Sequence, residues 1–360
     1  MKAAFGLVGL TSLAHAVTPT LNSYPGHSLA VENRTLHAIY EAAKQEQGEL
    51  IVLWGGDAVS QGTPTIEAWN ARFPDVKLKL TVDVSKYHDS RIDRQYQRTR
   101  SDGADIAVLQ TLHDFTRWKM EGRLLPYKPP HFNDVWASVK DADGAYYGTF
   151  IHSFGSFTYN PERVQDSDVP STFDELIQPK WKGKLALTYP NDDDAITFLF
   201  SLLINKYGWD WFEALVKQDV KWIRGTGEPA NYIALANSTR SLSFTTSASG
   251  KLKSKKPEDP IMLWPQTSAI FASTLRPESA KLFMSWLLSD EYQARFNGTY
   301  GVRKDLAATS NPWDDQSSGL SQFATFMDNR DQVEWWRLQF ETSIGTAQGV
   351  SPVQSFYGRR

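Results

Sequence analysis

The amino-acid sequence predicts an α/β protein of two lobes, each with a mainly parallel sheet, joined by a two-strand hinge. The first observation is length, since 360 residues suit two α/β domains better than one. The second is that short apolar runs alternate with helical stretches, a pattern typical of parallel strands covered by helices. The third is that two extended segments, near residues 150 and 267, interrupt this alternation. Two such connections between lobes form a hinge.

The first part of the chain alternates most regularly. A helix is expected over 36–47, because Gly48 follows it as a C-terminal cap. A second helix, with three large apolar side chains on one face, ends before Pro74. The remaining elements of this part are strands over 49–54, 76–82 and 104–109 and helices over 85–100 and 111–120.

The rest of the chain contains the two crossings. The stretch 146–160 is the first, an extended segment rich in aromatic residues. Alternation then resumes, with strands over 184–188 and 220–223 and helices over 195–207, 209–216 and 229–237. The basic run 251–256 is expected to be a solvated loop. The second crossing is an extended pair, 261–264 and 268–273, and a single amphipathic helix over 278–296 follows it.

This arrangement predicts how the chain divides into lobes. Residues 17–150 and 268–360 form the first lobe, and residues 151–267 form the second. A cleft between two such lobes is a usual place for a small ligand, and a hinge lets the lobes close on it.

The N-terminus has the form of a secretory signal peptide. Lys2 gives a positive start, residues 3–13 are apolar, and a small-x-small sequence ends at Ala16. The apolar run is too short to span a membrane, and no later run reaches that length. We therefore expect residues 1–16 to be removed and the mature protein to be secreted, extracellular or periplasmic, without membrane insertion.

Composition excludes several other classes of protein. The chain has no cysteine, which excludes disulfides, thiolate metal sites, a cysteine nucleophile and a lipid anchor on an N-terminal cysteine. A net charge of −3 and a pI near 6.2 give no reason to expect a nucleic acid partner. Sequons at Asn33, Asn237 and Asn297 would carry glycans only in a eukaryotic secretory pathway.

A series of short motifs resembles the extracellular solute-binding proteins of ABC importers. Residues 105–109 (DIAVL) followed by 121–127 (EGRLLPY) resemble a strand and a later turn of that family. Further motifs follow in the family's order at 143–148, 159–164, 170–176, 179–184, 280–283 and 300–303. Each fragment is weak alone, but their order and spacing over most of residues 48–305 are specific.

The resemblance is to the ferric-iron-type members (family 1), and it implies the type II periplasmic-binding fold. It implies capture of a small solute without catalytic residues, and delivery to an ABC permease in a bacterium. A secreted eukaryotic, fungal-like homologue would be a scavenger or carrier instead. Ferric members present an adjacent tyrosine pair to the metal, but 241–247 contains no tyrosine and the pair Tyr146-Tyr147 lies before the hinge. We therefore expect no iron bound through phenolates, no other metal and no cofactor.

The first lobe and the first crossing offer candidate ligand-binding residues. Ligands in such folds meet the carboxyl ends of strands and the N-termini of helices. Trp54 offers an aromatic face and the glycines after it allow close backbone approach; the alternative is a tight turn with Asp57 as a helix cap. Thr111 is a candidate cap, and a lone histidine is more often structural than functional. The candidates here are Trp54, Gly55, Gly56, Asp57, Gln110, Thr111, His113, Tyr147 and His152.

The second lobe offers a more polar set. Arg224 and Thr226, between glycines, suit a carboxylate or phosphate, although an ordinary strand-to-helix loop would have the same residues. The aspartates 192–194 suggest a cation, but a helix N-terminus favoured by the helix dipole is the better interpretation. Trp264 would close an aromatic side of the cleft or belong to the core. The candidates here are Asn191, Arg224, Thr226, Thr245, Thr246 and Trp264.

Three functions stay open on the sequence alone. The first is capture of a small anionic or aromatic organic solute by a monomer through hinge closure, with iron(III) at a site without tyrosine as a variant. The second is an enzyme on the same fold, although the sequence has no H-E-x-x-H, G-x-S-x-G or P-loop motif. The third is an interaction protein whose cleft is filled by bulky residues.

Overall fold

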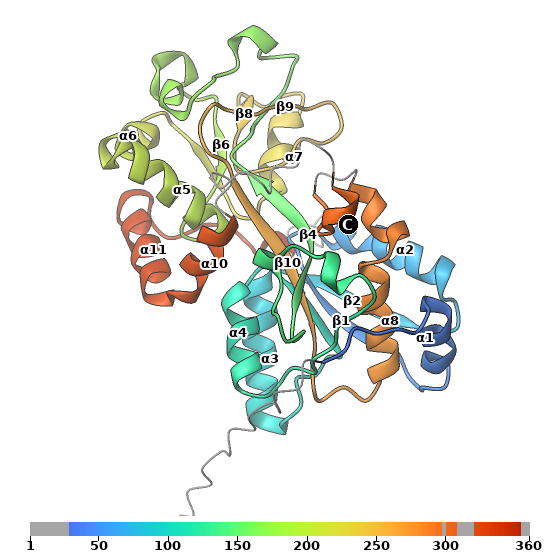
Figure 1. Ribbon diagram of the computed structural model, residues 1–360. Coiled ribbons are helices and arrows are strands. Elements are labelled where there is room, and N and C mark those ends of the chain that lie inside the picture. Colours follow the sequence, from blue (N-terminus) through green and yellow to red (C-terminus); the bar gives the residue numbers. More distant parts are fainter. Residues whose placement is uncertain (1–28, 297–299, 308–319, 354–360) are drawn as a thin grey trace, which may run out of the picture.

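The computed structural model describes residues 29–296, 300–307 and 320–353 of the chain (Figure 1). The predicted signal peptide and the sequon at Asn297 lie outside these ranges. The sequons at Asn33 and Asn237 lie within them, and both asparagines are exposed. A search of the described helices finds none that is long and apolar enough to cross a membrane.

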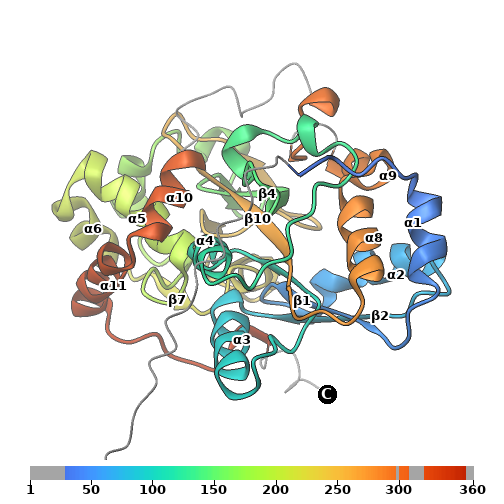
Figure 2. The same cartoon turned by 60° about the horizontal axis from the view of Figure 1, so that its bottom comes forward.

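A five-stranded sheet forms the first lobe. Its strands are β1 (Leu50–Gly55), β2 (Leu78–Asp83), β3 (Ile106–Leu109), β4 (Tyr147–Phe154) and β10 (Met262–Ile270), in the order β2-β1-β3-β10-β4. Strands β1, β2 and β3 run parallel, as predicted, whereas β10 pairs antiparallel with β3 and β4. Helices cover both faces: α1 (Leu36–Ala43), α2 (Thr63–Arg72), α8 (Pro277–Leu287) and α9 (Asp290–Gln293) on one, α3 (Ser85–Thr99) and α4 (Leu112–Met120) on the other (Figure 2).

Aromatic packing stabilises the face under α1, α2 and α8. Trp69 is fully buried there, with its ring centroid 4.7 Å from that of Phe73 and 5.6 Å from that of Trp286. Its indole Nε1 donates to the carbonyl of Val76 over 2.8 Å, so the buried donor is satisfied. Burying one such side chain contributes about 2–3 kcal/mol. A core of this kind stabilises a chain that has no disulfides.

A three-stranded and a two-stranded sheet form the second lobe. The strands β5 (Phe157–Tyr159), β8 (Leu242–Ser243) and β9 (Lys253–Lys255) pair antiparallel in the order β8-β5-β9, and β6 (Ala186–Thr188) pairs parallel with β7 (Lys221–Ile223). The helices of this lobe are α5 (Asp194–Tyr207), α6 (Trp209–Val216), α7 (Glu228–Ala234), α10 (Leu320–Asp328) and α11 (Arg330–Ile344). Its core is again aromatic, with the rings of Phe200 and Phe212 5.8 Å apart and edge to face.

The strands β4 and β10 form the hinge that the sequence predicts. Tyr147 and Ile270 belong to the core of the first lobe. Phe154 and Met262, at the other ends of the same two strands, belong to the core of the second. Since both strands pass from one core to the other, bending of this pair can move the lobes relative to each other.

The second crossing is one strand rather than a pair of extended segments. Pro265 interrupts the apolar pattern of the sequence, but it lies inside β10 opposite Ile151. The register shifts only between Gln266 and Thr267. A proline has no N–H to donate to a neighbouring strand, which explains an irregularity beside it.

The basic run 251–256 is not a free loop, because its middle part is the edge strand β9. Lys251 and Lys253 make ion pairs with Glu162 (2.7 Å) and Asp166 (2.8 Å). Charged side chains commonly protect the edge of a sheet from pairing with other chains. Lys253 and Lys255 therefore belong to an edge strand, and Lys251 lies in the turn before it.

Three predicted helices are shorter than the sequence pattern suggests. The helix predicted over 36–47 ends at Ala43, and Lys44 rather than Gly48 follows it as the C-cap. The helix predicted over 278–296 is divided, because α8 ends at Leu287 and the hydroxyl of Ser289 accepts from the backbone N–H of Tyr292 (3.3 Å) to begin α9. The helix predicted over 229–237 ends at Ala234.

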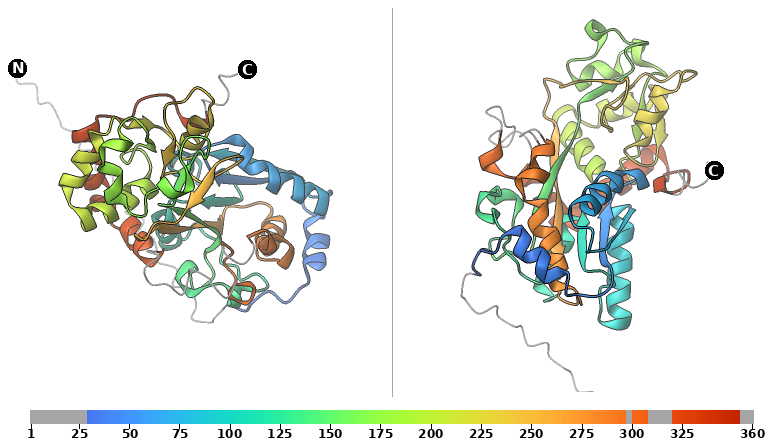
Figure 3. Two further views of the ribbon diagram at one scale, coloured as in Figure 1. Left: turned by 90° about the horizontal axis from the view of Figure 1, so that it is seen from above. Right: turned by 90° about the vertical axis from the view of Figure 1, so that its right-hand side faces the viewer.

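The C-terminal helices lie with the second lobe, contrary to the prediction that residues 268–360 belong to the first (Figures 1 and 3). The ring centroid of Phe326 in α10 lies 5.1 Å from that of Phe198 in α5, and Trp336 in α11 stacks on Trp209 in α6 at 5.6 Å. Both helices lie there because their apolar faces complete the core of the second lobe. The other lobe boundaries stay a prediction.

Candidate ligand-binding cleft

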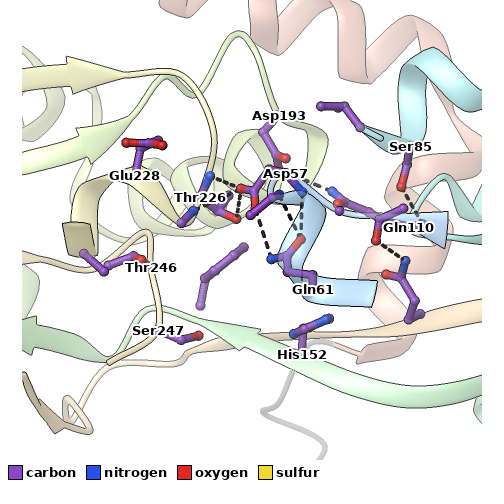
Figure 4. Close-up of a pocket in the computed structure, with 18 of the residues that line it drawn as sticks. Asp57, Gln61, Ser85, Gln110, His152, Asp193, Thr226, Glu228, Thr246 and Ser247 are labelled. Carbon is purple, nitrogen blue, oxygen red and sulfur yellow. Dashed lines mark hydrogen bonds between the residues drawn. The ribbon is translucent and has the colours of Figure 1, made fainter. Parts of the chain in front are cut away.

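A cavity of about 540 Å³ lies between the two lobes, beside the hinge strands (Figure 4). The first lobe lines it with the ends of β1 and β3, the segment between β2 and α3, and the middle of β4 and β10. The second lobe lines it with the starts of α5 and α7 and the loop after β8. The carboxyl ends of parallel strands thus meet the N-termini of helices, as is usual for ligand sites in such sheets.

An aromatic wall runs along β4 and β10. Phe150, His152 and Phe154 alternate along β4, so their side chains share one face of the strand. The indole of Trp264 stacks on His152 at 4.9 Å and lies 4.7 Å from Phe154, and Trp54 stacks on Phe150 at 5.6 Å. The His152 ring is accessible from the cleft, yet the surrounding protein desolvates it and lowers its pKa to about 4. The imidazole is therefore neutral at pH 7.

The carboxylate of Asp57 connects the first lobe to the second (Figure 4). Its Oδ2 accepts hydrogen bonds from the backbone N–H of Thr226, from the Thr226 hydroxyl (2.8 Å) and from the backbone N–H of Gly227 (3.0 Å). Gln61 Nε2 donates to the other oxygen over 3.1 Å. Gly225 has φ +84°, and turns of this kind aim successive N–H groups at one anion. The loop predicted to bind an anion therefore holds the protein's own carboxylate.

Asp193 and Gln110 form a second polar contact across the cleft. Asp193 caps α5, because its Oδ1 accepts from the backbone N–H groups of Ala195 (2.9 Å) and Ile196 (3.1 Å). Gln110 Nε2 donates to the same oxygen over 3.3 Å. Burial raises the pKa of Asp193 to about 6, so this carboxylate is mostly ionised at pH 7.

Arg224 is not among the residues that line the cavity, and its guanidinium has partners of its own. Its Nε donates to Asp192 over 2.8 Å and its Nη2 to the hydroxyl of Tyr87 over 2.9 Å. Lys86 Nζ pairs with the same carboxylate at 2.7 Å. Because Lys86 and Tyr87 belong to α3 of the first lobe, this network is a further connection between the lobes.

Gly55 lies where three elements meet at the end of β1. A Cβ atom at this position would lie 2.1 Å from the Ser85 hydroxyl and 2.9 Å from Gln266 Nε2. Gln266 Nε2 also donates to the carbonyls of Gly55 (3.0 Å) and Val108 (3.1 Å), which ties β10 to β1 and β3. The sequence predicted that a ligand would come close to the backbone at Gly55; in the structure the side chains of Ser85 and Gln266 occupy that place.

The structure brings part of the predicted set together. The candidates that line the cleft are Trp54, Gly55, Gly56, Asp57, Gln110, His152, Thr226, Thr246 and Trp264. The candidates that lie elsewhere are Thr111, His113, Tyr147, Asn191, Arg224 and Thr245.

Most candidates outside the cleft have structural partners. Tyr147 is fully buried and donates to a backbone carbonyl of α8 over 2.6 Å. The amide of Asn191 donates to the carbonyl of Gly345 after α11 (3.0 Å), and the hydroxyl of Thr245 accepts from the backbone N–H at the end of β6 (2.8 Å). Thr111 precedes α4 but its side chain makes no capping hydrogen bond.

Several lining residues are absent from the predicted set. They are Ala58, Ser60, Gln61, Val84, Ser85, Phe150, Phe154, Asp193, Gly227, Glu228, Ala230, Asn231, Ser247, Ser249 and Gln266. Phe150 and Phe154 could have been found from His152, because side chains two residues apart on a strand share a face. Gln266 carries no such signal, since its contacts in β1 and β3 are distant in the sequence.

The geometry of the cleft does not favour a metal. In the described ranges, sets of three metal-ligating side chains with their ligand atoms within 4.8 Å occur at Asp89, His113 and Asp114 and at His131, Asp134 and Asp305. Neither set lines the cleft, and no tyrosine is among the described residues that do.

Comparison with known proteins agrees with this architecture. Residues 102–318 match the family described as bacterial extracellular solute-binding protein. The protein y4fP of Sinorhizobium fredii, described as a probable ABC transporter periplasmic-binding protein, is 22% identical over 296 residues, which are 76% of this chain and 79% of that protein.

Solved structures of similar fold come from several bacteria. Iron-bound HitA from Pseudomonas aeruginosa has a TM-score of 0.62 at 16% identity, covering 81% of this chain and 99% of that one. The substrate-binding protein of an ABC transporter from Agrobacterium tumefaciens has a TM-score of 0.68 at 13% identity, with 83% and 96% covered. AfuA from Actinobacillus pleuropneumoniae, with fructose-6-phosphate bound, has a TM-score of 0.63 at 17% identity, with 84% and 100% covered.

These likenesses show the fold, and the family match covers more than half of the chain. The two lobes, the two-strand hinge and the cleft beside it are those of a type II periplasmic-binding fold. The chain therefore belongs to the bacterial extracellular solute-binding proteins.

Proposed function

We propose that this protein captures a small organic solute in the interlobe cleft by hinge closure and, in a bacterium, delivers it to an ABC permease. The observation that carries the proposal is a cavity of about 540 Å³ that both lobes line, beside a hinge of two strands. This volume suits a metabolite. A solute that contacts both walls stabilises the closed arrangement of the lobes.

The lining supports a solute with a planar or aromatic part. His152, Phe154 and Trp264 form one aromatic wall. The ring centroid of Trp264 lies 4.9 Å from that of His152 and 4.7 Å from that of Phe154. Offset stacking on such a ring contributes about 0.5–1.5 kcal/mol beyond the burial of apolar area. An aromatic solute is one of the two kinds of ligand that the sequence suggests.

The sequence also suggests an anionic solute, but the lining supports a neutral or cationic polar group on the solute better than an anionic one. The ionisable acids Asp57, Asp193 and Glu228 line the cavity, and no lysine or arginine is among the described residues that do. The neutral imidazole of His152 adds no positive charge at pH 7. Two like charges 4 Å apart repel by about 4 kcal/mol at an effective dielectric constant of 20, so an anionic group close to these carboxylates would be disfavoured.

Neither iron nor a sugar phosphate is proposed, although relatives of similar fold were solved with each. Among the residues that the structure describes, the cavity lining has no tyrosine for iron(III) and no lysine or arginine for a phosphate. The nest of backbone N–H groups at Thr226 and Gly227 already contacts Asp57.

A thermal-shift screen of ligand-stripped protein tests the proposal. The panel contains aromatic amines, thiamine-like cations, polyamines, carboxylated and phosphorylated metabolites, and iron(III) with and without citrate. A solute at 100 times its dissociation constant adds about 2.7 kcal/mol of stability, which is readily measured. We expect shifts with aromatic or cationic compounds.

Matched histidine variants assign any shift to the cleft. His152→Ala removes a ring from the aromatic wall, and His37→Ala removes an exposed histidine of α1 whose side chain is 76% accessible. The shift should shrink in the first variant and persist in the second. A shift that persists in both, or a response to iron(III) alone, would contradict the proposal.

A further inference from the structure

A group of metal-ligating side chains lies between α3 and α4, apart from the cleft. Asp89 belongs to α3, and His113 and Asp114 form part of the first turn of α4. One ligand atom from each of the three lies within 4.8 Å of the others. None of the three lines the interlobe cavity, so the solute-binding function leaves this group unexplained.

Two atoms of this group are buried without a partner. His113 Nδ1 and Asp114 Oδ2 are inaccessible and have no hydrogen-bond partner within the described ranges. The side chain of Asp114 is only 2% exposed. Buried polar atoms almost always have a partner, so an imidazole nitrogen and a carboxylate oxygen left without one point to a missing ligand.

The charges of the group also require a partner. Arg117 pairs with Oδ1 of Asp114 at 2.7 Å, whereas Oδ2 has no partner among the described residues. Asp89 brings a second carboxylate to the same group. His113 brings an imidazole, which binds metal ions through a ring nitrogen in its neutral form. Either a cation or a shared proton can relieve the repulsion between the two carboxylates.

We propose that Asp89, His113 and Asp114 bind one divalent metal ion of the zinc type. Imidazole nitrogens and carboxylate oxygens are both zinc ligands, and in sites with three protein ligands a water molecule completes the tetrahedron. Ca²⁺ and Mg²⁺ prefer six or more oxygen ligands and seldom an imidazole. The ion would join α3 to α4 and neutralise the charge that the two helices share.

Zinc titration of the tag-free, chelator-stripped full chain in competition with a chromophoric chelator tests this site. We expect one tight Zn²⁺ site per chain. Asp89→Asn and His113→Ala should each weaken binding by at least tenfold, because each removes one ligand. Asp89→Asn keeps the shape of the side chain and can donate to Asp114, so it should fold; far-UV circular dichroism checks this.

The exposed group His131, Asp134 and Asp305 provides a matched control. His131→Ala should leave the tight site unchanged. No tight binding to the wild type would overturn the proposal in favour of a proton shared by Asp89 and Asp114. Loss of binding only in His131→Ala would also overturn it, by assigning the zinc to the surface.

Discussion

Replacing Asp57 with asparagine should release the two lobes from each other without changing the size of the side chain. Oδ2 of Asp57 accepts three hydrogen bonds from the second lobe, all at Thr226 and Gly227. The amide oxygen of asparagine can take the place of Oδ2, so we expect the three hydrogen bonds to remain, each now to a neutral acceptor. A hydrogen bond to a charged group contributes about 1.5–3 kcal/mol and one to a neutral group about 0.5–1.5 kcal/mol, so each of the three bonds should weaken by about 1 kcal/mol. The closed arrangement then loses about 3 kcal/mol, or about 150-fold in population relative to the open one.

Single-molecule energy transfer measures this change. The chain has no cysteine, so two introduced cysteines carry the dyes without background labelling. Met120 at the end of α4 and Leu235 after α7 lie on different lobes and are 71% and 49% exposed. Ligand-free Asp57→Asn should show a larger population at the distance of the open state than the wild type does.

An intralobe variant provides the control. Asp75→Asn makes the same chemical change inside the first lobe, where Asp75 accepts from the hydroxyl of Tyr40 over 2.7 Å. It should leave the distance distribution unchanged. If Asp57→Asn also leaves it unchanged, the contacts with Thr226 and Gly227 do not hold the lobes together and the reasoning is refuted.

Three further predictions concern stability. Gly55→Ala should lower the free energy of unfolding by about 1–3 kcal/mol in urea titration, because its Cβ would lie 2.1 Å from the Ser85 hydroxyl; an unchanged midpoint would contradict that packing. Burial lowers the pKa of His88 to about 4 from 6.5, so the unfolded state binds more protons between these values and stability falls as the pH falls from 6.5 to 4, by up to about 3 kcal/mol. His88→Gln should flatten that slope, and an equally steep slope in the variant would contradict the assignment. Arg224→Ala should lower the melting temperature by several degrees, since it leaves Asp192 with Lys86 as its remaining cationic partner across the lobes; an unchanged melting temperature would show that this network adds nothing.

Local patterns predicted most of the fold. The strands β1, β2 and β3 follow from apolar runs, and the hinge follows from two interruptions of the alternation. The sequence does not reveal where α8 ends, because the apolar face continues past Ser289 and only a capping hydrogen bond marks the break. Nor does it reveal that α10 and α11 pack on α5 and α6, since that depends on contacts such as Phe326 with Phe198 between distant segments.

The site was predicted less completely, for a similar reason. Loops at strand ends were the right place to search, and they supplied Trp54, Asp57 and Thr226. Their partners could not be predicted, because the bond between Asp57 and Thr226 joins residues 169 positions apart. Arg224 suited an anion in isolation, but in the fold it pairs with Asp192.

The most direct test of the central claim is calorimetric titration of the protein with an aromatic amine from the screen and with its carboxylated counterpart. The titration is repeated in Trp264→Ala, which alters the aromatic wall, and in Trp335→Ala, which alters an exposed tryptophan of α11. If an aromatic and acidic cleft holds the solute, the amine should bind to the wild type with one molecule per chain. The carboxylated counterpart should bind the wild type at least tenfold more weakly than the amine does, and the amine should bind Trp264→Ala at least tenfold more weakly than the wild type. Its affinity for Trp335→Ala should equal its affinity for the wild type. Preference for the carboxylate, or equal affinity in both tryptophan variants, would contradict the account.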